Sequence, residues 1–143
     1  MLLTRPVTVH RDTPFAVPRA PLSELTLALV TTAGLHVRGD RPFTGDDPTF
    51  RIIPSDAGED RLVQSHTSIG FDRTPQARDI NVVLPIDRLR ELVERGELGR
   101  LGPNHYAVLG AQQDPERVAA VSAQPLADRL RADQVDVVLL TPT

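Results

Sequence analysis

Two short, almost unbroken apolar segments constrain the fold of this chain most strongly. The first covers residues 25–31, between Pro21 and Gly34, and the second covers residues 135–141. A strand that is buried on both faces reads as a continuous apolar run of this length, and such strands are typical of parallel sheets. The sequence therefore predicts two buried strands of one sheet, with the printed chain ending on the second.

Helical patterns alternate with strands in the second half of the chain. The sequence predicts strands over residues 80–84 and 106–109 and helices over residues 88–95 and 126–132. Asp87 is the expected N-cap of the first helix, and Gly96 ends it. A further helical stretch starts at Asp114-Pro115 and is broken or restarted by Pro125. This alternation predicts an α/β fold with a mainly parallel sheet and flanking helices, doubly wound as in Rossmann-like and flavodoxin-like proteins.

The rest of the chain sets the domain organisation. Residues 1–24 contain four prolines, which interrupt any backbone ladder, so we expect a Pro-rich N-terminal arm. Residues 25–143 are expected to form a single α/β domain, because a chain of 143 residues has the usual length of one domain. Asn81 falls inside a predicted buried strand, where its amide needs partners from the local backbone or from a subunit interface.

Residues 38–78 are rich in Gly, Pro, Asp and Thr and show little periodicity. Within them, only residues 50–53 and 61–64 resemble short strands. The apolar side chains of this segment indicate that it packs on the core; they are Phe43, Phe50, Ile53 and Phe71. Its carboxylates do not have the spacing of an EF-hand loop and are expected to be solvated; they are Asp46, Asp47, Asp56, Glu59 and Asp60.

The composition excludes several classes of site. The chain has no Cys, which excludes disulfides, thiolate zinc sites, iron–sulfur clusters and a cysteine nucleophile within these residues. Its formal net charge of −3 and its 3% aromatic content argue against a nucleic-acid partner. There is no apolar stretch of roughly 20 residues and no signal-peptide pattern at the start, so we expect a cytoplasmic protein without a membrane partner.

The candidate polar residues gather after predicted strands. In the segment Thr31–His36 of the printed sequence, a glycine and two threonines permit close backbone approach to a ligand, but the composition favours a tight turn with an ordinary surface histidine. The histidines lack helical spacing, which favours hydrogen-bonding roles and no metal site. Ser65 and His66 are adjacent in an extended segment and point to opposite faces, and no G-x-S-x-G motif exists, so a serine hydrolase is not expected.

Six segments occur in a fixed order from about Pro21 to the end of the chain. They are residues 29–36 (LVTTAGLH), 47–54 (DPTFRIIP), 65–66 (SH), 79–92 (DINVVLPIDRLREL), 103–106 (PNHY) and 135–142 (VDVVLLTP). As an ordered set they resemble the selenoprotein B family of the glycine, sarcosine, betaine and D-proline reductases. The chain resembles a short form of that family.

This resemblance implies reductive cleavage of a C–N bond. A pyruvoyl group on a partner subunit forms a Schiff base with the substrate amine, a selenolate attacks the α-carbon, and a thiol resolves the selenium adduct. A selenol suits this step because it is more acidic than a thiol and is more fully ionised near neutral pH. In the family the selenocysteine follows a strand like residues 135–141. The resemblance therefore implies no catalytic residue within the chain, a selenocysteine immediately after Thr143, and a domain truncated at its C-terminus and inactive as printed.

The same resemblance implies where the substrate, an amine or amino acid, would bind. The pocket candidates beyond the strand ends are Thr31, Thr32, Gly34, His36, Ser65, His66, His105 and Thr141. The family often has a second histidine or an acid soon after the Ser-His pair, whereas here residues 67–70 read TSIG. A non-catalytic small-molecule-binding or assembly module on the same scaffold remains the alternative. A homo-oligomer is expected, because an uncovered sheet edge favours self-association.

Overall fold

The structure is a computed structural model that describes residues 16–66, 70 and 72–143. Residues 1–15 of the expected N-terminal arm and Phe71 lie outside the described residues, as do residues 67–69. Within the described part, Arg19 of the arm forms an ion pair with Asp136, just before the last strand. Phe43 and Ile53 are buried, as predicted.

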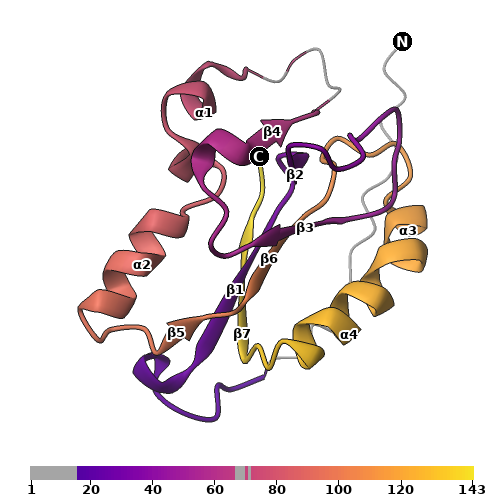
Figure 1. Cartoon of the computed structure of the whole chain (residues 1–143). Helices are drawn as coiled ribbons and strands as arrows, with labels where there is room; N and C mark the ends of the chain where they lie inside the picture. Colours follow the sequence, from indigo (N-terminus) through magenta and orange to yellow (C-terminus); the bar gives the residue numbers. More distant parts are fainter. Residues whose placement is uncertain (1–15, 67–69, 71) are drawn as a thin grey trace.

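The main sheet is built around one central strand, β1 (Figure 1). Along one side of β1 runs β7, parallel and in register from Leu27↔Val137 to Thr31↔Thr141. The other side is shared by β5 and β6, both parallel to β1, and β3 lies antiparallel to β6 at the far edge. The bounds are β1 (Thr26–Thr31), β3 (Arg51–Pro54), β5 (Arg100–Leu101), β6 (Asn104–Ala107) and β7 (Val137–Thr141). The sheet is therefore mixed but mostly parallel.

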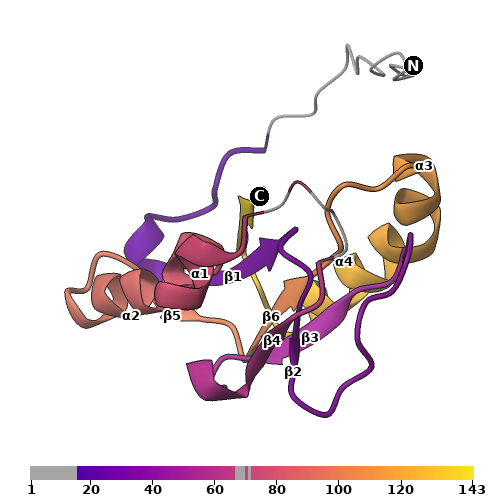
Figure 2. The ribbon, with the colours of Figure 1, turned by 90° about the horizontal axis from the view of Figure 1, so that it is seen from above.

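Helices flank this sheet on two sides (Figure 2). Leu27 and Leu29 of β1 belong to the core cluster that also contains Ile86 and Leu89 of α2. Val30 points the other way and lines a groove against η4 and α4. The helical elements are α2 (Ile86–Glu94), α3 (Pro115–Val118), the π-helix η4 (Ala119–Ala123) and α4 (Gln124–Ala132). The α/β class is thus confirmed, whereas the doubly wound Rossmann-like or flavodoxin-like subclass stays a prediction.

A small second sheet lies above the carboxyl end of β1. It pairs β2 (Leu35–Val37) with β4 (Leu62–Gln64) in antiparallel fashion, with His36 opposite Val63. Short helical turns complete the chain; they are η1 (Leu22–Glu24), η2 (Glu59–Arg61), α1 (Thr74–Arg78) and η3 (Ile80–Val82). The strands predicted over residues 50–53, 61–64 and 106–109 are present with shifted bounds.

The predicted strand over residues 80–84 is wrong, because Ile80–Val82 forms the 3₁₀ helix η3. The Asp79 carboxylate accepts the backbone N–H of Asn81 (2.9 Å) and so starts a turn, and the buried side chains of Ile80, Val83 and Leu84 follow helical spacing. Here local hydrogen bonding prevails over the β-branched composition.

Asn81 finds its partners in the local chain. Its Oδ1 accepts the backbone N–H of Asp87 (3.0 Å), and its Nδ2 donates to the carboxylates of Asp79 and Asp87. The predicted N-cap role of Asp87 is therefore wrong: Asp87 lies inside the first turn of α2, and Asn81 supplies the acceptor. Gly96 does end the helix, with φ +71°.

The last strand is not buried on both faces, which corrects a central expectation. Among the described residues β7 pairs only with β1, and Leu139 and Leu140 are 38% and 67% exposed. An apolar run shows that the side chains of a strand are hydrophobic, but it does not show which other elements pack against them. At Asp114 the prediction is confirmed, since its carboxylate accepts the N–H of Arg117 (3.1 Å). Pro125 does not break the helical stretch: it lies in the first turn of α4, which restarts the α-helix directly after the π-helix, the second of the two predicted outcomes.

Candidate functional site

The carboxyl ends of β1 and β7 meet at Thr32. The Thr32 hydroxyl accepts the backbone N–H of Thr143 (2.9 Å), and the Thr32 N–H donates to the carbonyl of Thr141 (3.2 Å). Its Oγ1 also lies 3.2 Å from the hydroxyl oxygen of Thr143. One side chain at the end of β1 therefore fixes the backbone that follows β7.

Thr31 and Thr141 support this junction from inside. The Thr31 hydroxyl donates to the carbonyl of Thr141 (3.4 Å) and accepts the N–H of Ala33 (3.2 Å). The Thr141 hydroxyl donates to the carbonyl of Val83 (3.1 Å) in the turn after η3. Both hydroxyls are satisfied by backbone groups, so they hold the strand ends in place.

Gly34 joins the main sheet to the small sheet at a point where other segments lie close to its backbone. Its φ is +65°, and a Cβ at this position would lie 3.1 Å from a Leu109 methyl and 3.3 Å from the backbone nitrogen of His66. Its N–H donates to Val108 (3.0 Å), and its carbonyl accepts from Ser65 (3.0 Å). Only glycine combines this conformation with this approach.

His66 is brought to the same edge. It is buried, and a Cβ on Gly110 would lie 3.1 Å from its Nε2 and 2.9 Å from the carbonyl of Thr32. The N–H of Gly110 donates to that carbonyl (2.8 Å). Burial, and then the positive charge of Arg73, lower the pKa of His66. The neutral imidazole therefore lies against the turn that is bonded to Thr32.

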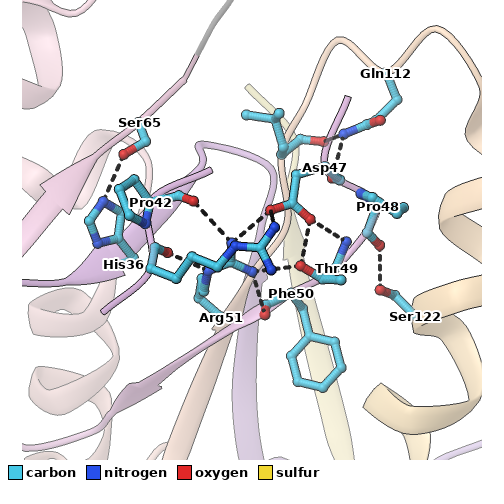
Figure 3. A network of polar contacts seen from close by, with 12 residues as sticks. His36, Pro42, Asp47, Pro48, Thr49, Phe50, Arg51, Ser65, Gln112 and Ser122 are labelled. Atoms are coloured by element: carbon cyan, nitrogen blue, oxygen red, sulfur yellow. Dashed lines mark hydrogen bonds and ion pairs between the residues drawn. The ribbon is translucent and has the colours of Figure 1, made fainter. Parts of the chain in front are cut away.

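His36 pairs with Ser65, a contact that their sequence separation hides. The His36 Nε2 lies 2.7 Å from the Ser65 hydroxyl, and its Nδ1 lies 3.0 Å from the carbonyl of Val37 (Figure 3). Because a carbonyl can only accept, Nδ1 donates to Val37, and Nε2 shares a hydrogen bond with the Ser65 hydroxyl, which can donate or accept. Ser65 and His66 do not form a pair, as predicted. A different Ser–His contact forms instead, between His36 in β2 and Ser65 directly after β4.

Asp47 is buried and anchors the loop before β3, so its expected solvation is wrong (Figure 3). Its carboxylate binds the guanidinium of Arg51 (2.7 Å) and the hydroxyl of Thr49 (2.5 Å). Burial would raise the pKa of Asp47, but the hydrogen bonds from Thr49 and Arg51 outweigh it and lower the pKa. The remaining acidic residues of this segment are exposed as predicted; they are Asp46, Asp56, Glu59 and Asp60.

The same loop is tied to the helical side of the molecule. Gln112 donates to the carbonyl of Asp47 (3.0 Å), and the Ser122 hydroxyl of η4 donates to the carbonyl of Pro48. Sequence reasoning missed this network. Its one signal was the opposite charge of Asp47 and Arg51 four residues apart, inside a segment that already resembled the family.

His105 lies away from this edge, in the interior. Its Nδ1 accepts the backbone N–H of Leu29 (3.1 Å), and its Nε2 lies 3.1 Å from the Ser55 hydroxyl. Desolvation by burial, with a smaller contribution from Arg90, lowers the pKa of His105 to about 4. Between the end of β5 and the start of β6, the imidazole takes the place of the backbone carbonyl that would otherwise accept the N–H of Leu29. The role of His105 is therefore structural. Among residues 16–66, 70 and 72–143, no three His, Asp or Glu side chains form a metal-binding group.

The fold and this edge define an α/β protein with its polar cluster beyond the carboxyl ends of parallel strands, where such folds bind ligands. The family described as "Glycine/sarcosine/betaine reductase selenoprotein B (GRDB)" matches residues 5–143. The chain belongs to this family. The resemblance predicted from the six ordered segments is thereby confirmed.

Similar proteins are subunits of reductases. The chain is 36% identical to the D-proline reductase subunit gamma of Acetoanaerobium sticklandii over 121 residues, which is 84% of this chain and 49% of that protein. It is 34% identical to the glycine reductase complex component B subunit gamma of Carboxydothermus hydrogenoformans (85% and 29%) and 32% identical to the betaine reductase complex component B subunit beta of Peptoclostridium acidaminophilum (90% and 30%). The chain thus spans about half or less of their length. No solved structure matches it. None of the helices in its described part is long and apolar enough to span a bilayer.

Proposed function

We propose that this chain is a component of an amino-acid or amine reductase complex that cleaves a C–N bond reductively. Family membership supports a reductase role, and the observation that carries the proposal is the junction at Thr32. That side chain fixes the backbone at Thr143, directly after the strand β7, which we propose to precede a selenocysteine. A pyruvoyl-bearing subunit is the proposed partner, as the resemblance to the reductase family implies.

The residues at this edge suit an acidic selenol or thiol next to Thr143. His66 Nε2 faces Gly110, whose N–H is bonded to Thr32, and Thr32 in turn holds Thr143. A nearby neutral imidazole stabilises the anion of such a group by accepting its proton. When present, the group supplies the electron pair for C–N cleavage.

The chain's own side chains then have distinct tasks. Because its pKa is lowered, His66 is neutral near neutral pH, and a neutral imidazole can accept a proton from an adjacent acidic group. Thr32 orients the backbone at Thr143, and the hydroxyls of Thr31 and Thr141 keep the two strand ends together. The pair of His36 and Ser65 offers a second polar contact at the neighbouring sheet for the substrate.

Reconstitution tests the proposal. The chain would be co-expressed with a pyruvoyl-bearing reductase subunit, once as printed and once with a cysteine directly after Thr143. We expect both versions to co-purify with the partner. Only the second should release amine from glycine, sarcosine or betaine, or open the ring of D-proline, with a dithiol as reductant. Thr32→Val should lower that rate at least tenfold, whereas Thr44→Val, in an exposed loop position, should not.

The alternative is a binding or assembly module without chemistry, favoured by the absence of any Cys in the printed residues. A stable complex that never releases amine in the cysteine-extended version would support this alternative and overturn the reductase proposal. Failure to bind the partner together with the absence of turnover would overturn it as well.

A further inference from the structure

A groove of about 380 Å³ lies between the sheet and the π-helix side of the molecule. Its floor comes from the carboxyl halves of β1 and β7 and the residue after β6, and its wall from α3, η4 and α4. The lining residues are Val30, Thr32, Val108, Val118, Ala119, Ser122, Ala123, Leu126, Leu140, Thr141 and Pro142. This volume lies in the range of small-molecule sites, and the carboxyl edge of a parallel sheet is where α/β folds place them.

The lining selects the chemistry of the ligand. None of the described side chains that line the groove carries a charge. The Ser122 hydroxyl is already donated to the carbonyl of Pro48, and the Thr32 hydroxyl is bonded to Thr143. A carboxylate or ammonium group inside the groove would lose its hydration without gaining a partner, which is costly, whereas a hydrocarbon group would be favoured.

Two sets of polar contacts tie the helical wall of the groove to the rest of the molecule. The Ser122 hydroxyl in η4 donates to the carbonyl of Pro48, and Asp133, directly after α4, accepts hydrogen bonds from Tyr106 (2.6 Å) and Asn104 (3.0 Å). Between these ties α4 buries none of its side chains fully. Ala119 and Ala123 of the π-helix line this wall with single methyl groups, which fill little of the space opposite Val30 and Leu140.

We propose that this groove binds the hydrocarbon substituent of the substrate. The inference rests on the proposed function for one step only, the reaction next to Thr143. Thr32 and Pro142 line the groove, and both lie directly against Thr143. The substituent of a carbon that reacts next to Thr143 would therefore be directed into the groove. The substrate class is then an amine or amino acid with an aliphatic or aromatic group. Glycine, which has no side chain, would leave the groove empty.

Binding of primary amines of increasing length to the full chain tests the inference without any partner. Nitrogen–proton correlation spectra would be recorded with ethylamine, n-butylamine and n-hexylamine. Since each buried methylene contributes roughly fourfold in affinity, we expect affinity to rise by about that factor per carbon, with shifts at Ala119, Leu126 and Leu140. Ala119→Trp should fill the groove and abolish the dependence on length. Ala120→Trp, the same change at the exposed neighbouring position that does not line the groove, should keep it.

Two outcomes would overturn the inference. The first is affinity that does not change with amine length, or that responds equally to the two tryptophan variants. The second is a dimer in light scattering that Ala119→Trp dissociates, because the groove would then be a subunit interface. The reconstitution experiment separates this inference from the proposed function. Turnover of glycine without binding of n-hexylamine would overturn the groove inference alone. Binding of n-hexylamine without any turnover would overturn the reductase proposal alone.

Discussion

At the scale of single residues, the buried polar groups separate into structural and chemical roles through their partners. His66 and His105 are both buried in the described structure, but His66 faces the turn bonded to Thr32, whereas His105 uses both ring nitrogens inside the sheet. No sequence pattern distinguishes these two histidines, because each follows a short polar segment. Only their three-dimensional neighbours assign one to the edge and the other to the core.

The stability of the protein should depend on pH through His105. Its pKa is about 4 in the folded chain and 6.5 in the unfolded chain, so between these values the unfolded state binds the extra proton. The contribution of His105 to the free energy of unfolding is therefore complete above pH 6.5, and it decreases by about 3 kcal/mol as the pH falls to 4. His105→Asn retains an acceptor for the N–H of Leu29 and should remove most of this slope in urea titrations. Identical slopes in the two proteins would contradict the assignment.

Asp47 provides a second test at this scale. Asp47→Asn leaves the buried guanidinium of Arg51 without its carboxylate, and we expect a loss of about 3–5 kcal/mol in the free energy of unfolding. Asp46→Asn makes the same change at the exposed neighbouring residue and should shift stability by less than about 0.5 kcal/mol. Chemical denaturation followed by circular dichroism measures both. Equal effects would show that the ion pair does not hold the loop.

At the scale of elements, the ends of helices were predicted correctly only where their partners are close in sequence. Asp114 and Gly96 were predicted correctly, whereas Asp87 was not, because the acceptor for its N–H is Asn81, six residues earlier. Residues 80–84 were misread, since β-branched residues favour a strand while Asp79 and the asparagine after Ile80 favour a turn. The deciding hydrogen bonds link residues two to six positions apart, which a two-residue periodicity does not detect.

The end of α4 offers a test of helix capping. Gln134 has a φ of +54°, a conformation that glycine adopts without strain, so Gln134→Gly should stabilise the chain by about 1 kcal/mol. Gln124→Gly is the same chemical change at the first residue of α4 and should destabilise by about the same amount. Thermal unfolding would compare the two variants. A loss of stability in both would mean that the positive φ carries no strain.

At the scale of the whole molecule, the exposed edge of β7 is the dominant feature. Its five residues carry no charge, and outside β1 no described strand pairs with it. Natural proteins usually protect such edges with charges, bulges or covering elements. The predicted homo-oligomer therefore remains a direct expectation from this surface.

Self-association would be measured by sedimentation velocity over a range of concentrations. We expect association that Leu139→Lys weakens at least tenfold, because a lysine on an edge strand opposes pairing. Leu22→Lys introduces the same charge at an apolar residue that is 44% exposed in η1, away from β7, and should leave association unchanged. A monomer at every concentration would contradict this expectation.

The sequence by itself determined the α/β class, the strands around residues 26–31 and 137–141 and the family, because apolar runs, caps and motif order are properties of neighbouring residues. Tertiary structure alone decided which histidine meets Ser65, that Asp47 is buried with Arg51, and that β7 is an open edge. These outcomes depend on contacts between segments far apart in the chain. Their energies come from burial and from partners that no local pattern encodes.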